Sequence, residues 1–290
     1  MDHYLTDIFS DTDLDRLRAG KRLNPNKETD DIVAAWLVDK DEDGEYEHGE
    51  WQMALAHWFN QASVHGTTVS DAYKKRLRSC VGNREQFFQT VGELMSACFL
   101  EEQLGFDLVY LEHANTQERR RIPDFRLSKA RVDVVAEVKT SIGGVSGPIF
   151  GAVPSRIPRV RKALQQVRGK FRTEDINIVL IVDFWRPPID HHTVFDAMYG
   201  KLSARCWIGP NGPVGDWQPV RQGDRSCTDD CNTRVGAVGV LSWRGGVESG
   251  GYFIHNAHAE PPVPPHILDP LPQLVPNEDG SKLVGRNWPR

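Results

Sequence analysis

Two strand-like segments, 122–127 (IPDFRL) and 132–140 (VDVVAEVKT), constrain the fold of this chain more than any other feature. Alternate side chains of a β-strand share a face, so Asp124 lies opposite the apolar side chains of the first segment. In the second segment Glu137 and Lys139 share a face. If the two segments pair as a hairpin, the two carboxylates converge beside the amine. Such a set suits a divalent metal ion and an activated water.

The order of these residues is similar to the motif of the PD-(D/E)xK nuclease superfamily, to which many restriction endonucleases and recombination nucleases belong. A Pro-Asp pair ends at Asp124, thirteen positions before Glu137, and Glu137 forms a Glu-x-Lys motif with Lys139. Members of the superfamily tend to carry a glutamate on the helix before the first core strand, and Glu93 occupies that place. The resemblance covers about residues 85–184. It implies an α/β fold with a restriction endonuclease-like mixed sheet flanked by helices.

The resemblance also implies a set of roles in phosphodiester hydrolysis. Asp124 and Glu137 would hold Mg²⁺ or Mn²⁺ together with the backbone carbonyl of Val138. Lys139 would position or deprotonate the attacking water, and Glu93 would complete a second metal site or orient that water. The function expected from the resemblance is a metal-dependent nuclease with DNA favoured over RNA, acting as the effector of a bacterial defence or restriction system.

The surrounding segments have the periodicities that this core requires. A helix is predicted over 85–104, where Glu93 lies on a largely apolar face. A strand is predicted over 106–111, a helix over 158–172, and a strand buried on both faces over 176–184. The order is therefore helix, strand, hairpin, helix, strand.

Basic residues are concentrated in two places on a chain whose net charge is −5. Positions 156–172 hold seven basic residues and no acidic one, which favours contact with phosphate groups. The candidates for nucleic-acid binding are Arg119, Arg120, Arg121, Arg161, Lys162, Gln165, Arg168 and Lys170. The alternatives are an arginine cluster that only aids solubility and a solvated amphipathic helix.

Residues 1–84 are predicted to form a helical N-terminal region, with helices over 30–38 and 51–62. Between these helices, residues 39–50 contain seven acidic residues. The segment fits the calcium-loop pattern of EF-hands. The matching residues are Asp39, Asp41, Asp43, Gly44 and Glu50. A solvated acidic loop is the favoured interpretation, and a Ca²⁺-responsive module is the alternative.

The C-terminal part is predicted to add a β-hairpin to the sheet, formed by strands over 235–243 and 251–255. Residues 206–234 contain Trp, Gly and Pro without a clear period and are predicted to be irregular. From Glu260 onward proline is dense, which predicts an extended or disordered tail. The expected organisation is a helical region over 1–84, a nuclease core with its extension over 85–259, and a proline-rich tail over 260–290.

The composition limits the setting in which the chain would act. The five cysteines are scattered and odd in number, which predicts reduced thiols in a cytoplasm. No segment has the length of apolar sequence that crosses a bilayer, and the first residues lack the pattern of a signal peptide. The expected partners are nucleic acid and either a second copy of the chain or a helicase or sensor subunit, with no membrane.

Two other interpretations of the acidic and basic residues remain open. Asp124, Glu137 and Lys139 can form a cross-strand salt-bridge ladder on a solvated sheet face. A fold of this kind can also bind nucleic acid as a catalytically inactive scaffold, since fold does not guarantee activity.

Overall fold

The computed structural model describes residues 4–19, 31–40, 42–43, 45, 47–111, 122–141, 156–167, 169–184, 189–209, 212–222, 227, 233–245, 248–277 and 283–288. Its N-terminal helices are α1 (Asp11–Arg18), α2 (Asp31–Val38), α3 (Gly49–Ser63) and α4 (Thr67–Cys80). Helix α5 (Arg84–Cys98) follows and continues into a π-helical turn, η1 (Phe99–Gln103). The next elements are β1 (Asp107–Tyr110), β2 (Phe125–Lys129), β3 (Val132–Ser141), α6 (Ile157–Val167), β4 (Ile176–Asp183) and α7 (His191–Tyr199). The remaining elements are β5 (Lys201–Gly209), β6 (Gly212–Gln222), β7 (Ala237–Gly245), β8 (Glu248–His255), the 3₁₀ turn η2 (Pro265–Leu268), β9 (Gln273–Pro276) and β10 (Leu283–Arg286).

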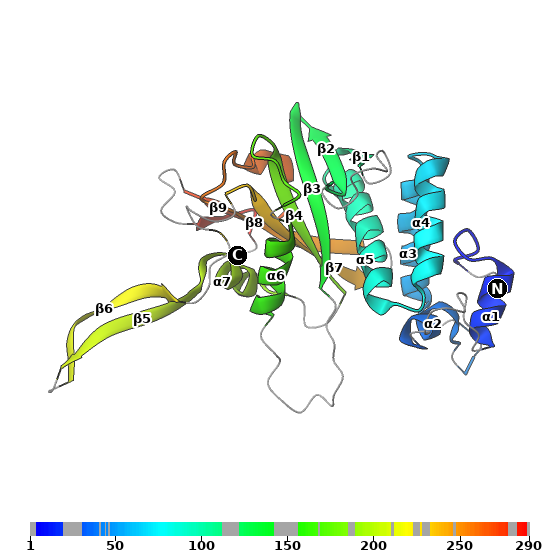
Figure 1. The fold of residues 1–290 in the computed structure, drawn as a ribbon, viewed down its shortest axis with the longest axis horizontal. Helices are drawn as coiled ribbons and strands as arrows, with labels where there is room; N and C mark the ends of the chain where they lie inside the picture. The colour runs from blue at the N-terminus through cyan, green and yellow to red at the C-terminus, as the bar shows by residue number, and fades with distance from the viewer. Residues whose placement is uncertain are drawn as a thin grey trace.

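Eight of the strands form one mixed sheet in the order β1-β2-β3-β4-β7-β8-β9-β10. Strands β3, β4 and β7 run parallel, and antiparallel pairs flank them on both sides. Helix α5 covers one face of the sheet and helices α6 and α7 cover the other (Figure 1). The predicted α/β class, with a mixed sheet between helices, is confirmed.

The hairpin of β2 and β3 forms as predicted, with Phe125 opposite Ala136 and Leu127 opposite Val134. Its turn consists of Ala130 and Arg131, both with positive φ. Two-residue turns of this kind match the twist of antiparallel strands. Continuing the register by one residue places Asp124 across from Glu137.

Strand β3 is buried on both faces, which fixes the direction of its side chains. Val134, Ala136 and Val138 pack into the core beneath α5, whereas Val135 packs into the core beneath α6. The side chain of Glu137 lies on the same face of β3 as Val135 and is fully buried. Because each buried aliphatic side chain contributes about 1.5–3 kcal/mol, the register of β3 is strongly specified.

Helix α5 approaches the sheet closely at Gly92. A Cβ atom at this position would come closer than 3.0 Å to Thr140 Oγ1 and would also contact Val182. The helix begins at Asn83, whose side chain accepts a hydrogen bond from the backbone N–H of Gln86. The close approach brings the polar side chains of α5 within reach of the end of β3.

The N-terminal region is helical, as predicted, and its helices share one hydrophobic core with α5 and the sheet. Trp51 and Trp58 of α3 are buried in this core together with Phe87 and Phe88 of α5. None of the helices that the structure describes combines the length and apolar character needed to cross a membrane.

Two predictions about the C-terminal half are wrong. Residues 206–234 are not irregular throughout, because β5 and β6 form a separate two-stranded antiparallel sheet that projects from the main body (Figure 1). The proline-rich tail is neither simply extended nor disordered over its described residues, because β9 and β10 complete the main sheet and Val263, Ile267 and Leu268 lie in its core. The predicted hairpin of β7 and β8 is confirmed.

Candidate active site

Asp124 directly precedes β2 and is held in place by the neighbouring strand β3. Its Oδ2 atom accepts a hydrogen bond of 2.7 Å from the backbone N–H of Val138. The side chain is almost completely enclosed, since Asp124 is 6% exposed. The hairpin thus directs this carboxylate inward, toward the end of β3.

Glu137 lies one residue before Val138 and is 0% exposed. Its Oε1 atom is 2.5 Å from Lys139 Nζ and 2.6 Å from Lys170 Nζ. Its Oε2 atom is buried and has no hydrogen-bond partner among the described residues. A buried carboxylate oxygen without a donor is costly, so a cation or an ordered water at this atom would stabilise the site.

Glu93 projects from α5 and is 4% exposed. Arg76 of α4 binds it through two contacts, 2.7 Å from Nη1 to Oε2 and 2.9 Å from Nη2 to Oε1. Tyr73 donates a longer hydrogen bond of 3.4 Å to Oε2. A glutamate on the apolar face of a helix is thus accommodated by a cation from the adjacent helix.

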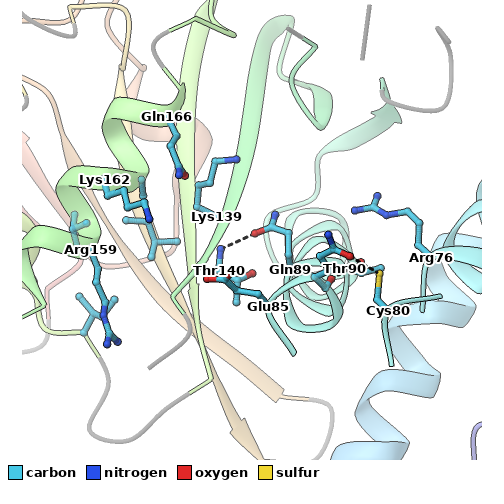
Figure 2. Close-up of a pocket in the computed structure, with 15 residues that line it drawn as sticks. Arg76, Cys80, Glu85, Gln89, Thr90, Lys139, Thr140, Arg159, Lys162 and Gln166 are labelled. Carbon is cyan, nitrogen blue, oxygen red and sulfur yellow. Dashed lines mark hydrogen bonds between the residues drawn. The ribbon is translucent and has the colours of Figure 1, made fainter. Parts of the chain in front are cut away.

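Gln89 links α5 to β3 and to Glu93. Its Nε2 atom donates to the carbonyl of Val138 at 3.0 Å and to Glu93 Oε1 at 3.2 Å. Its Oε1 atom accepts a hydrogen bond of 3.0 Å from the backbone N–H of Thr140 (Figure 2). The side-chain amide therefore fixes the helix that carries one carboxylate against the strand that carries another.

The three carboxylates interact electrostatically although each has its own partners. Burial raises the pKa of Asp124 well above its usual range, and the negative charges of Glu137 and Glu93 raise it further. Lys170 and the hydrogen bond from Val138 act in the opposite direction. The interior of the site consequently favours an additional positive charge.

A pocket of about 840 Å³ opens at the carboxyl ends of the parallel strands β3 and β4. Its walls come from α4 and α5 on one side and α6 on the other (Figure 2). Four of its lining side chains are cationic and one is acidic: Arg76, Lys139, Arg159, Lys162 and Glu85. Arg76 and Lys139 are ion-paired with Glu93 and Glu137, so the exposed Arg159 and Lys162 offer the positive charge that suits a ligand with phosphate groups.

The structure separates the predicted nucleic-acid-binding residues into different places. Lys162 is exposed and lines the pocket, and Gln165 is exposed on the same helix. Arg161 instead donates a hydrogen bond of 3.4 Å to the carbonyl of Asp196 in α7. Lys170, predicted to bind nucleic acid, lies at Glu137 in the interior of the site.

Several predicted residues lie outside the described part of the chain. They are Arg119, Arg120, Arg121 and Arg168, together with Asp41 and Gly44 of the acidic loop. The expectation of calcium binding at 39–50 therefore stays untested. The solvated salt-bridge ladder is wrong in one respect, because Glu137 and Asp124 are buried rather than solvated.

Two contributors to the site were missed by the sequence analysis. Arg76 lies in α4, and nothing in its neighbourhood of the sequence indicates that it faces Glu93. Gln89 precedes Glu93 by one helical turn, so its position on the same face was the available signal.

The residues at the site fit a divalent cation with few protein ligands. The unpaired Glu137 Oε2 atom, Asp124 and the carbonyl of Val138 are hard oxygen donors of the kind that Mg²⁺ prefers. In the described part of the chain, the three carboxylates do not form a group with all ligand atoms within 4.8 Å of one another. The fit is to an ion that keeps several waters, rather than to a fully enclosed cage.

Comparison with known proteins adds no family assignment. The sequence matches no protein-family model, and neither a curated protein nor a solved structure gives a match. The function of the site consequently has to follow from its own geometry and chemistry.

Proposed function

We propose that the protein is a magnesium-dependent nuclease of the PD-(D/E)xK type, acting on DNA in preference to RNA. The observation that carries this proposal is the buried group formed by Glu93, Asp124 and Glu137 beside Lys139, at the edge of an electropositive pocket. The raised pKa of Asp124 supports it, because a bound cation would allow this carboxyl group to ionise.

Asp124 and Glu137 would hold Mg²⁺ or Mn²⁺, with the carbonyl of Val138 as a third ligand. A divalent ion at this place would offset the charge on a scissile phosphate and acidify a bound water. Glu93 is already paired with Arg76, so it would orient that water through its remaining hydrogen-bonding capacity. Gln89 keeps the carbonyl of Val138 in position by donating to it.

Lys139 combines two properties that suit a group acting on the attacking water. Its ammonium contacts Glu137 Oε1, and its side chain also lines the pocket where substrate would lie. Lys170, in the segment that follows α6, contacts the same Oε1 atom. With two ammonium groups on one carboxylate oxygen, Lys139 can leave Glu137 for a phosphate oxygen while Lys170 keeps that carboxylate paired.

The pocket walls would bind the sugar-phosphate backbone without reading its sequence. Arg159 and Lys162 are exposed on α6, and Arg76 lies on the opposite wall. Phosphate contacts of this kind give affinity that falls with salt concentration. Action within a bacterial defence or restriction system, with a second copy or a helicase or sensor subunit as partner, extends the same proposal.

The proposal is tested by incubating the full chain with single- and double-stranded DNA and RNA, in Mg²⁺, in Mn²⁺ and in chelator. Metal-dependent cleavage should fall at least about 100-fold in Asp124→Ala and in Lys139→Ala. The matched control is Asp133→Ala, which removes an exposed carboxylate from β3, the strand that carries Lys139. This variant should cleave as wild type does. Equal cleavage by wild type and both site variants would contradict the assignment.

A catalytically inactive scaffold that binds nucleic acid is the second candidate. The observation in its favour is that Glu93 and Glu137 are already paired with Arg76, Lys139 and Lys170. A scaffold would bind DNA equally well with and without metal, would lose affinity with salt, and would release no product.

A further inference from the structure

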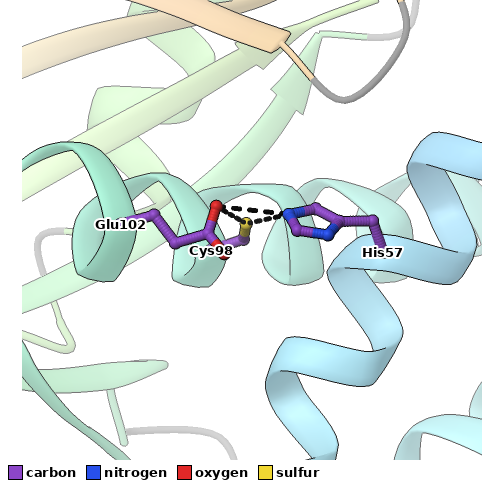
Figure 3. Close-up of side chains that lie close together, drawn as sticks. All are labelled: His57, Cys98 and Glu102. Atoms are coloured by element: carbon purple, nitrogen blue, oxygen red, sulfur yellow. Dashed lines mark hydrogen bonds and ion pairs between the residues drawn. The ribbon is translucent and has the colours of Figure 1, made fainter.

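A second cluster of metal-ligating side chains lies outside the proposed active site, where α3 meets the end of α5. It consists of His57 from α3, Cys98 at the last position of α5 and Glu102 in the π-helical turn η1 (Figure 3). One ligand atom from each residue lies within 4.8 Å of the others. No other group of three such side chains meets this condition among the residues that the structure describes.

The distances within this cluster match the edges of a tetrahedron around a zinc ion. Zinc lies about 2.3 Å from thiolate sulfur, about 2.0–2.1 Å from imidazole nitrogen and about 2.0–2.2 Å from carboxylate oxygen, which gives tetrahedral ligand-to-ligand distances of about 3.3–3.7 Å. The observed separations are 3.5 Å from Cys98 Sγ to His57 Nε2, 3.3 Å from Sγ to Glu102 Oε2, and 3.2 Å from Nε2 to Oε2. All three lie inside that range or within about 0.1 Å of it.

The arrangement differs from that of a cysteine nucleophile with a catalytic base. In such a relay one imidazole nitrogen faces the nucleophile and the other is oriented by the acid. Here Nε2 of His57 faces both Cys98 and Glu102, so the three ligand atoms converge on one point (Figure 3). Cys98 is also 4% exposed, which leaves little access for a substrate.

The local backbone supports this convergence. Helix α5 widens into η1 directly after Cys98, and the backbone N–H of Leu104 donates to the carbonyl of Phe99 five residues earlier. Single π-helical turns occur frequently at functional sites. The widened turn presents the carboxylate of Glu102 beside the thiol of Cys98, which precedes Glu102 by four residues.

We propose that His57, Cys98 and Glu102 bind a zinc-class divalent transition-metal ion that joins α3 to the α5–η1 segment. Thiolate and imidazole ligands select such ions over magnesium, so this site would be chemically distinct from the carboxylate site. The side chains of His57 and Glu102 are 31% and 40% exposed, so water can complete the coordination. The ion would fasten the N-terminal helices to the helix that carries Glu93.

The test uses the full chain, freed of metal by a chelator and titrated with Zn²⁺ in competition with a chromophoric chelator. Wild type should bind one Zn²⁺ at this cluster, and Glu102→Gln and Cys98→Ala should each weaken that binding at least about 10-fold. Cobalt substitution should give a thiolate-to-metal charge-transfer band that Cys98→Ala abolishes. Zinc should also raise the melting temperature of wild type more than that of Glu102→Gln.

The matched control is Cys80→Ala, which removes another buried thiol on the neighbouring helix and should leave the affinity and the cobalt band unchanged. Glu102→Gln keeps the proposal testable if Cys98→Ala fails to fold, because Glu102 is at the surface. Unchanged zinc affinity in Glu102→Gln, or a cobalt complex without a thiolate band, would overturn the proposal. Neither result depends on nuclease activity.

Discussion

At the scale of single residues, the ionised carboxylate of Asp124 that metal binding requires is unfavourable for the stability of the metal-free fold. Burial and the nearby charges of Glu137 and Glu93 raise its pKa well above the ordinary value. The folded metal-free protein therefore binds the Asp124 proton more tightly than the unfolded chain does. Through this group, the free energy of unfolding falls as pH rises above the ordinary value of 3.8, toward the raised pKa.

Asp124→Asn should remove this conflict. The amide is neutral at every pH and still offers an oxygen to the N–H of Val138. In chelator at pH 8 the free energy of unfolding, measured by urea titration, should rise by about 1 kcal/mol or more, while metal-dependent cleavage is lost. Asp133→Asn should change neither quantity, and an Asp124→Asn variant less stable than wild type at pH 8 would contradict the electrostatic account.

At the scale of elements, the separation of α5 from β3 determines how the site is assembled. Gly92 lies against Thr140 of β3. On the same helix, Gln89 accepts a hydrogen bond from the backbone of Thr140, and Glu93 pairs with Arg76 of α4. A side chain at position 92 would push the helix away from the strand. Both the stability of the fold and the geometry of the carboxylates depend on this contact.

Gly92→Ala tests that dependence. Helix propensity alone would stabilise the variant by up to about 1 kcal/mol, but overpacking against Thr140 should cost about 1–3 kcal/mol and reduce cleavage. In the Thr140→Ala background the clash with Oγ1 is absent, so the same substitution should cost less or become stabilising. A double-mutant cycle of urea unfolding measures the coupling, and strict additivity would show that the close approach has no energetic consequence.

The C-terminal strands provide a second element with a measurable property. His255 at the end of β8 forms a hydrogen bond of 2.8 Å with Gln273 at the start of β9, and both side chains are buried. Burial lowers the pKa of His255 below its ordinary value of 6.5, although the hydrogen bond that its Nε2–H donates to Gln273 Oε1 partly opposes this effect. The imidazole is therefore neutral in the folded protein near neutral pH.

Protonation of His255 should destabilise the docked tail. The unfolded chain binds this proton more readily than the folded protein does. The contribution of neutral His255 to the free energy of unfolding is therefore complete above pH 6.5 and is lost as pH falls from 6.5 toward the lowered pKa. Urea unfolding at pH 7.5 and pH 5 should show a smaller pH dependence in His255→Gln than in wild type. An unchanged pH dependence would indicate that this histidine titrates alike in both states.

At the scale of the whole molecule, one hydrophobic core extends from the N-terminal helices through α5 to one face of the sheet, and a second core lies beneath α6 and α7. The site lies where these layers meet, at the carboxyl ends of β3 and β4. Carboxylates from the hairpin, a glutamate from α5 and cations from α4 and the segment after α6 can converge only because all layers share the sheet. The candidate zinc cluster would add a further link between the N-terminal helices, through His57 of α3, and the α5–η1 segment.

Local pattern was sufficient to predict the central part of this fold. The alternation across 122–140 predicted the hairpin, and the apolar face around Glu93 predicted its burial, because each depends on neighbours in sequence. Arg76 and His57 could not be assigned in this way, since their partners lie on other helices. The tail was misjudged because proline density suggests an extended chain, whereas Ile267 and Leu268 gain their burial from the distant strands they cover.

The central claim is that Asp124 and Glu137 form a divalent-cation site, and Mn²⁺ binding to the chelator-treated full chain tests it most directly. Electron paramagnetic resonance of free Mn²⁺ should detect a site in wild type and in Glu102→Gln, because Glu102 belongs to the separate His57–Cys98–Glu102 cluster. Asp124→Asn and Glu137→Gln should each weaken Mn²⁺ binding at this site at least about 10-fold. Equal Mn²⁺ binding by wild type and both carboxylate variants would contradict the account.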